Sequence, residues 1–173
     1  MKFHSGFSLS NEEVFFETFI KKSEYTVCGF SYGAIKAFEY VKKQLKNSQR
    51  VDTLQLFSPA FFQTKSEKFK RLQTLAYSKN QMKYLEQFIN GCFSPYEPKS
   101  IEHSQTCLED LEELLYYKWL IDDLKYLQDK GVVIEVYLGG QDTIIDVKSA
   151  EALFLEVATV TYIKNANHFL QIN

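Results

Sequence analysis

The sequence lacks long apolar runs: no stretch of its 173 residues approaches the roughly 20 apolar residues that a membrane-spanning helix requires. The start of the chain also has no signal-peptide core, because polar His4 and Ser5 follow Lys2 closely. Cysteine is scarce, and three scattered cysteines suit neither a disulfide framework nor a zinc knuckle. Their odd number favours a reducing compartment, so we expect a cytoplasmic protein that enters no membrane.

A strong charge imbalance is absent as well. The formal net charge is −2, from 20 basic and 22 acidic residues, which argues against a surface that binds nucleic acid. No internal repeat, low-complexity tract or interdomain linker is found. With 45% hydrophobic residues the chain has enough apolar material for a full core, and we expect a single domain over residues 1–173.

The most informative stretch that is present runs from Tyr25 to Ala34. A short β-prone run there breaks into Gly29-Phe30-Ser31-Tyr32-Gly33 and continues as an amphipathic helical pattern. This order is typical of a nucleophile elbow, in which a serine occupies a tight turn between a strand and a helix. Glycines flank the serine because a side chain at either place would crowd the turn.

Short apolar runs alternate with helical patterns along the rest of the chain. The expected strands are 1–4, 25–30, 51–57, 132–138 and 159–163. Such alternation predicts an open parallel α/β sheet, and right-handed crossovers place the loops that follow the strands along one edge. That edge is where ligands bind in such sheets.

Helices are expected between these strands. Ser10 and Glu13 have the spacing of a capping box, which predicts a helix as far as Lys22. Residues 60–105 show no clear strand and predict two helices with a proline-bearing turn. Leucines at helical spacing predict one longer helix from Leu108 to Leu127, and we interpret the acidic residues near its start as a solvated face (Glu109, Asp110, Glu112 and Glu113).

Three residues with side chains suited to catalysis directly follow predicted strands. All three therefore share one sheet edge. A serine hydroxyl needs a base within hydrogen-bond reach, and the base needs a carboxylate that holds its tautomer. We predict that Ser31 is the nucleophile, His168 the base and Asp142 the orienting acid. The backbone N–H groups of Tyr32 and Phe7 are the predicted oxyanion donors, with the Phe7 ring lining the acyl pocket.

Each of these assignments has a competitor. Asp146 is the alternative acid, although it stands where a helix N-cap is wanted. His4 and His103 are the alternative bases, but only His168 follows the last strand. Phe7 is alternatively no more than a packing residue.

Taken together, the motifs at Gly29 to Gly33, Gly140-Gln141-Asp142 and Asn167-His168-Phe169-Leu170 resemble those of an α/β-hydrolase over residues 1–173. The short form resembles the BioV-type pimeloyl-acyl-carrier-protein methyl ester esterases of biotin synthesis. Supporting stretches are Lys2 to Phe7, Leu56-Phe57-Ser58-Pro59 and Phe69-Lys70-Arg71-Leu72-Gln73.

This resemblance implies an abbreviated fold with a sheet of about five strands. Usual members have two further strands ahead of the oxyanion-hole strand and another before the elbow. The resemblance also implies that residues 60–105 form a helical lid over the acyl chain. Basic residues at the start of this lid would attract an acidic acyl carrier protein, with a solvated helix face as the alternative (Lys65, Lys68, Lys70 and Arg71).

The implied reaction is hydrolysis of the methyl ester of pimeloyl-acyl carrier protein, which releases methanol. We expect no metal and no organic cofactor. Another acyl esterase or a thioesterase would use the same three residues. A third possibility, from a different class, is an inactive hydrolase-like module that only binds acyl carrier protein.

Overall fold

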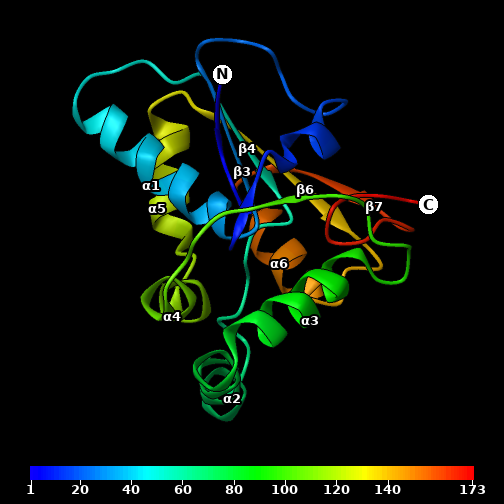
Figure 1. The fold of residues 1–173 in the computed structure, drawn as a ribbon. Coiled ribbons are helices and arrows are strands. Elements are labelled where there is room, and N and C mark those ends of the chain that lie inside the picture. Colours follow the sequence, from blue (N-terminus) through cyan, green and yellow to red (C-terminus); the bar gives the residue numbers. More distant parts are fainter.

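The computed structural model describes residues 1–173 and contains one five-stranded parallel sheet (Figure 1). Its strand order is β1–β3–β4–β6–β7, and every neighbouring pair is parallel. The strands are β1 (Lys2–His4), β3 (Thr26–Phe30), β4 (Thr53–Phe57), β6 (Val133–Gly139) and β7 (Thr159–Ile163). The predicted parallel α/β sheet of five strands is confirmed.

The helices form two groups around this sheet. Three of them, α1, α5 and α6, pack against the strands, whereas α2, α3 and α4 lie together at the bottom of Figure 1. No helix is both long and apolar enough to cross a membrane. The helical elements are η1 (Glu12–Phe16), α1 (Tyr32–Lys46), α2 (Glu67–Lys79), α3 (Gln81–Phe93), α4 (Leu108–Tyr116), α5 (Ile121–Asp129) and α6 (Val147–Phe154).

The two faces of the sheet bury different amounts of apolar material. On the face covered by α1, α5 and α6, a cluster of 29 buried residues includes Leu54, Leu56 and Val136. On the other face, the cluster has 11 buried residues. Burial of aliphatic and aromatic side chains is the main stabilising contribution to such a fold. The smaller cluster therefore leaves the second face more dependent on other contacts.

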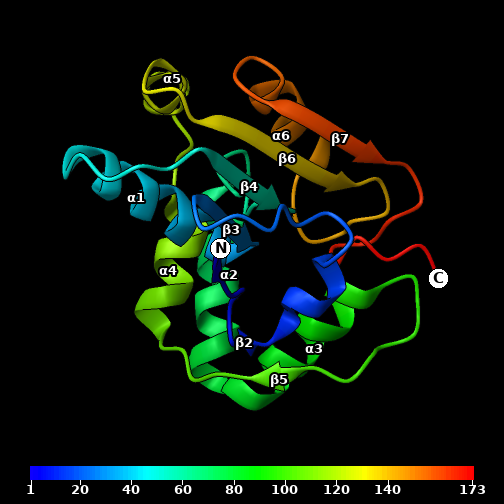
Figure 2. The same ribbon diagram turned by 90° about the horizontal axis from the view of Figure 1, so that it is seen from above.

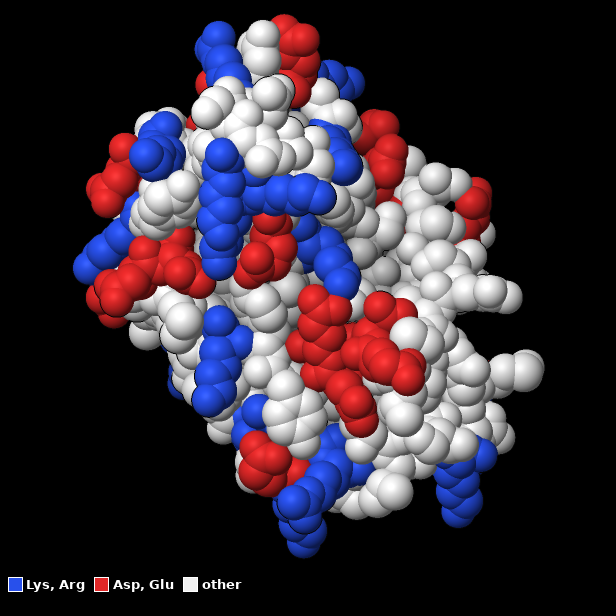
Figure 3. Space-filling view, turned by 90° about the vertical axis from the view of Figure 1, so that its left-hand side faces the viewer, with Lys and Arg blue, Asp and Glu red and all other residues white.

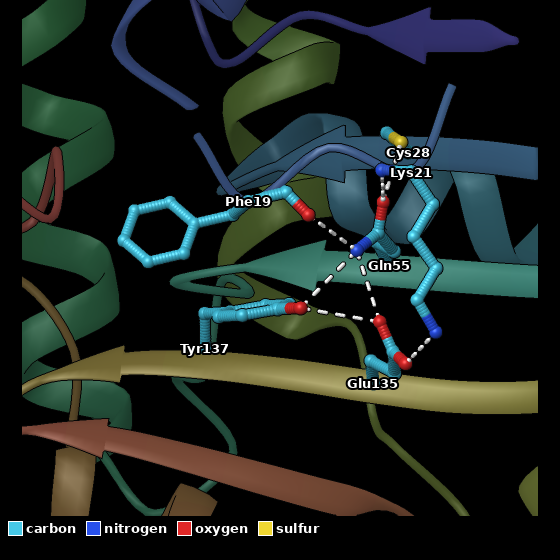
Figure 4. Close-up of polar contacts among 6 residues, drawn as sticks. All are labelled: Phe19, Lys21, Cys28, Gln55, Glu135 and Tyr137. Carbon is cyan, nitrogen blue, oxygen red and sulfur yellow. Dashed lines mark hydrogen bonds and ion pairs between the residues drawn. The ribbon is translucent and has the colours of Figure 1, made fainter. Parts of the chain in front are cut away.

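Those contacts come from the segment 11–24, which we call the N-terminal arm. Its link to the sheet is the buried side chain of Gln55, in the middle of β4 (Figure 4). Gln55 Oε1 accepts from the Lys21 backbone N–H (2.8 Å), and its Nε2 donates to the Phe19 carbonyl (2.9 Å). The same Nε2 lies 2.9 Å from Glu135 Oε2, and Glu135 forms an ion pair with the Lys21 ammonium. The amide thus ties the arm to two strands.

The predicted helix from Ser10 to Lys22 is wrong. Ser10 is extended and belongs to β2 (Leu9–Ser10), and only the 3-10 turn η1 follows it. Asn11 precedes this turn in the left-handed region at φ 59° and makes no side-chain cap. A regular helix as far as Lys22 would need the Lys21 N–H within its own ladder. That N–H donates to Gln55 Oε1 instead.

The predicted helix from Leu108 to Leu127 is also wrong, because it is broken into α4 and α5. The break contains Trp119, whose backbone N–H donates to Gln63 Oε1 (2.7 Å) and whose indole N–H donates to the Ala60 carbonyl (2.8 Å). The indole is buried against Phe38. The sequence pattern also missed β5 (Glu102–His103), which pairs antiparallel with β2 (Figure 2).

We expect the substitution Gln55→Leu to destabilise the protein by about 1–3 kcal/mol, because it leaves the partly buried Lys21 N–H and Phe19 carbonyl without their partner. Urea denaturation would measure the free energy of unfolding. Gln49→Leu serves as the control, since Gln49 is exposed beyond the end of α1. Equal stability of Gln55→Leu and wild-type protein would contradict the role of this amide.

Candidate active site

Ser31 occupies a turn that few residues tolerate. It lies between β3 and α1 with φ at 53°, in the left-handed region, and its N–H donates to the Phe57 carbonyl (2.9 Å). A Cβ atom at Gly29 would lie 2.2 Å from the Gly33 carbonyl oxygen, and one at Gly33 would lie 1.9 Å from the His4 carbonyl oxygen. Both positions therefore require glycine. The motif folds as a strained strand-to-helix elbow that presents the serine at the sheet edge.

His168 and Asp142 meet this serine from two other loops at the same edge. His168 Nε2 lies 3.0 Å from Ser31 Oγ, and His168 Nδ1 lies 2.6 Å from Asp142 Oδ2. The other oxygen, Asp142 Oδ1, accepts from the backbone N–H groups of Ile144 (2.8 Å) and Ile145 (3.3 Å). These bonds fix the carboxylate. The structure thus brings together all three residues that the sequence analysis selected.

The competing residues lie elsewhere. Asp146 caps α6, accepting from the Ser149 backbone N–H (3.2 Å), and the hydrogen bonds from Ser149 and Thr64 lower the pKa of its carboxyl. His4 packs on Tyr40, and burial lowers its pKa to about 4. His103 is exposed on β5. None of these side chains contacts Ser31.

Both predicted oxyanion donors have free N–H groups. Tyr32 is the first residue of α1, where backbone N–H groups have no partner within the helix. The Phe7 N–H makes no hydrogen bond within the chain. The Phe7 ring is fully buried and meets the rings of Tyr32 and Phe88 edge-on, at 6.2 and 6.0 Å between centroids. Phe7 therefore packs beside the elbow and has an N–H available for a ligand.

The tyrosine after the serine makes a contact that the sequence analysis missed. The Tyr32 hydroxyl lies 2.7 Å from Glu113 Oε2 and 3.0 Å from Asp110 Oδ1, both on α4. Burial and these two carboxylates raise the pKa of the phenol. Lys36 adds an ion pair to Glu113 (2.5 Å). The acidic side of α4 is therefore partly a link to the elbow helix, whereas the sequence suggested only a solvated face.

Asn167, which directly precedes the histidine, was also missed. Its Nδ2 donates to the Phe93 carbonyl at the end of α3 (2.7 Å), and its Oδ1 accepts from the Gln171 N–H (3.0 Å). Asn167 is fully buried, and Phe169 packs on Phe93 with ring centroids 4.5 Å apart. Asn167 ties the histidine loop to the end of α3.

A cavity of about 330 Å³ lies between α2, α3, α4 and the loop after β6. Its wall contains no charged side chain. Thr143 and Ile144, which follow Asp142 directly, form one side of the wall. The remaining lining residues come from α2, α3, α4 and the segment before α2: Phe62, Phe69, Gln73, Ala76, Tyr84, Gln87, Phe88, Leu111, Leu114 and Leu115.

Access to the serine is restricted in this conformation. Ser31 is 2% exposed and His168 is completely buried. A substrate therefore reaches the serine only when the side chains or helices above it move. No group of three or more His, Cys, Asp or Glu side chains is arranged to hold a metal ion.

The basic residues in and just before the first turns of α2 do not all face solvent. Lys68 and Arg71 are exposed and Lys65 is half-buried, but Lys70 is buried with its Nζ 4.7 Å from the centre of the Tyr116 ring. Lys70 is therefore removed from the predicted surface patch. On the side of the molecule drawn in Figure 3, groups of basic and acidic side chains alternate. The structure has no continuous basic surface there.

No protein-family model matches the sequence, and neither does any curated protein. Solved structures do match. An esterase from Exiguobacterium antarcticum has a TM-score of 0.63 at 15% identity, over 83% of this chain and 59% of the esterase. This is the α/β-hydrolase fold. The chain spans less than two thirds of the length of that esterase.

Two further structures with this fold are closer in length to the chain. Est816, an N-acyl homoserine lactone degrading enzyme, has a TM-score of 0.62 at 14% identity, over 98% of this chain and 86% of its own. BioG from Haemophilus influenzae has a TM-score of 0.57 at 7% identity, over 97% of this chain and 87% of its own. The α/β-hydrolase fold therefore also occurs in proteins nearly as short as this one.

Proposed function

We propose that the protein is a serine carboxylester hydrolase with Ser31, His168 and Asp142 as its catalytic residues. The observation that carries the proposal is the buried hydrogen-bonded series from Asp142 through His168 to Ser31 at a strained elbow. A carboxylate fixed by two backbone N–H groups holds the imidazole, and the imidazole holds the serine hydroxyl. This is the arrangement that activates a serine nucleophile.

The geometry supports a two-step reaction. Ser31 Oγ attacks the ester carbonyl carbon while His168 Nε2 takes the hydroxyl proton, and the carbonyl oxygen becomes an oxyanion. The free N–H groups of Tyr32 and Phe7 are the proposed donors to that oxyanion. His168 then gives its proton to the leaving alcohol, which departs and leaves an acyl-serine. A water molecule, deprotonated by His168, attacks the acyl-serine and releases the acid.

For the substrate, we propose the methyl ester of pimeloyl-acyl carrier protein. Two observations support this choice beside the sequence resemblance. The cavity next to Asp142 is mainly apolar and lacks charged groups, so it suits an acyl chain whose end is masked as an ester. Esterase and lactone-degrading names among the fold neighbours also fit carboxylic ester chemistry.

The proposed partner is an acidic acyl carrier protein that docks on α2. Lys65, Lys68 and Arg71 remain from the predicted patch, and the adjacent Leu72 and Leu75 are 54% and 64% exposed. A surface that combines cations with apolar side chains fits an acidic helical partner. Helix α2 also forms part of the cavity wall, so a carrier bound there would hold its acyl chain near the cavity.

Three substrates distinguish the candidate functions: methyl pimeloyl carrier protein, the free dimethyl ester and a pimeloyl thioester. We expect the carrier-bound methyl ester to be cleaved with the highest kcat/KM. Faster cleavage of the thioester would favour a thioesterase with the same catalytic residues. Binding of the carrier protein without cleavage of any substrate would favour an inactive binding module.

Reversing the charge of Lys68 and Arg71 together (Lys68→Glu with Arg71→Glu) tests the docking surface. We expect KM for the carrier-bound ester to rise about tenfold, since each lost rim contact weakens steering and binding by about 1 kcal/mol or less. Hydrolysis of a small ester should not change. The control carries Lys22→Glu with Lys125→Glu, two exposed lysines outside α2. An equal effect on both substrates would remove the docking proposal.

A further inference from the structure

The N-terminal arm carries a fully buried acid outside the group Ser31, His168 and Asp142. Glu12, the first residue of η1, has no exposed surface, and its Oε1 accepts from the Gly6 backbone N–H (2.6 Å). Its other oxygen, Oε2, is buried without a hydrogen-bond partner. Burial raises the pKa of this carboxyl. Buried acids without a charged partner are uncommon, and those that occur often have a specific role.

The hydrogen bond to Glu12 comes from the loop that carries the proposed second oxyanion donor. Gly6 immediately precedes Phe7, whose N–H is free. On its other side Gly6 is confined by Phe30, because a Cβ atom at Gly6 would lie 2.9 Å from the Phe30 ring. The loop is therefore held between a ring of the elbow strand and a carboxyl of the arm. The loop has one internal backbone bond, from the Leu9 N–H to the Gly6 carbonyl (3.2 Å), and at its far end the Ser8 carbonyl accepts from the Ser104 N–H (3.1 Å).

We propose that Glu12 is a positioning residue for ester hydrolysis: by accepting the Gly6 N–H, it sets the orientation of the next peptide, so that the Phe7 N–H faces the developing oxyanion. This inference rests on the proposed function. The inference adds a role for the N-terminal arm, which the proposed function does not include. An oxyanion donor is effective only when it is held in place before the charge develops, and the hydrogen bond from Gly6 to Glu12 supplies that restraint.

A merely structural role for Glu12 predicts a different outcome. If the side chain only fastens the arm, its loss lowers stability and leaves the chemistry of the folded protein unchanged. If it positions Phe7, its loss lowers kcat and spares KM, because the oxyanion forms only in the transition state. The two roles are therefore separable by kinetics.

The test compares Glu12→Leu, which removes the acceptor, with Glu12→Gln, which keeps an acceptor oxygen. Glu13→Leu is the control, since Glu13 is the adjacent acid and makes no such bond. With a small methyl ester we expect kcat of Glu12→Leu to fall about ten- to a hundredfold, part of the loss that removal of a whole donor causes. KM should stay within twofold. Glu12→Gln and Glu13→Leu should keep kcat within about threefold of wild type.

Inhibition gives a second readout. A trifluoromethyl ketone binds a catalytic serine as a tetrahedral oxyanion, so its inhibition constant should rise by the same factor as kcat falls. Should Glu12→Leu fail to fold in thermal unfolding, Glu12→Asp replaces it. Its carboxyl is one methylene too short to reach Gly6, and the same losses are expected.

Unchanged kcat in folded Glu12→Leu or Glu12→Asp overturns the inference, and so does a loss in Glu12→Gln as large as in Glu12→Leu. In both cases active wild-type enzyme leaves the proposed function intact. A wild-type protein that hydrolyses no ester and does not react with a fluorophosphonate overturns the proposed function, and this inference with it.

Discussion

Ester hydrolysis by Ser31→Ala protein is expected to fall by about 10⁵- to 10⁶-fold, the loss that follows removal of a serine nucleophile that works as a unit with its base. The substitution removes the oxygen that lies 3.0 Å from His168 Nε2 and leaves the rest of the site intact. Labelling by a fluorophosphonate should disappear together with hydrolysis, because the reagent forms its bond to the same oxygen.

Ser58→Ala is the matched control for this experiment. Ser58 directly follows β4, is buried and also has a positive φ, but its hydroxyl has no partner and no proposed role. We expect this variant to keep its labelling. Labelling of Ser31→Ala as strong as that of wild type would show that another residue reacts. Absence of labelling in folded wild-type protein would contradict every enzymatic function proposed for the site.

The elbow and its two partners were predictable because each rests on local information. A strand, Gly-x-Ser-x-Gly and an amphipathic helix in direct succession favour a tight turn, and the glycines here have no room for a side chain. Asp142 and His168 were predictable for a second reason, since loops after parallel strands must meet at one edge. The fold and the positions of the three side chains therefore followed from patterns within short stretches.

The elements that could not be predicted depend on partners that are distant in the sequence. The helix expected from Leu108 breaks because Trp119 bonds to residues more than 50 positions earlier. The helix expected from Ser10 is replaced by η1 because the Lys21 N–H donates to Gln55, which lies 34 positions later. Helical periodicity describes a segment in isolation and contains no information about such competitors.

The N-terminal arm links the middle of the sheet to the loop beside the elbow. In this five-stranded sheet β1 is an edge strand, so no further strand lies beside the loop that follows it. The arm supplies the missing support, since Gln55 fastens one end of it to β4 and Glu12 holds Gly6 at the other. Phe16 packs between these contacts, with its ring 4.7 Å from that of Phe57. The arm thus links the packing of the second sheet face to the geometry beside the elbow.

Replacing the carboxylate that contacts the histidine, in Asp142→Asn, should lower kcat by about 10⁴-fold while leaving the fold intact. Asn keeps an oxygen for the N–H groups of Ile144 and Ile145, so its amide nitrogen must face His168 Nδ1. Nδ1 then has to accept, and the ring proton moves to Nε2. In that tautomer Nε2 cannot take the proton of Ser31. The initial rate of hydrolysis of a small methyl ester measures the effect.

Asp146→Asn is the matched control, because Asp146 lies four residues away and is the other acid that the sequence offered. Asparagine caps helices as well as aspartate does, so α6 should keep its N-cap and kcat should stay within about twofold. A rise in pH should not restore Asp142→Asn, since its defect lies in the tautomer and not in the protonation state. If Asp146→Asn lost as much activity as Asp142→Asn, the bond between Asp142 and His168 would not be the one that orients the base.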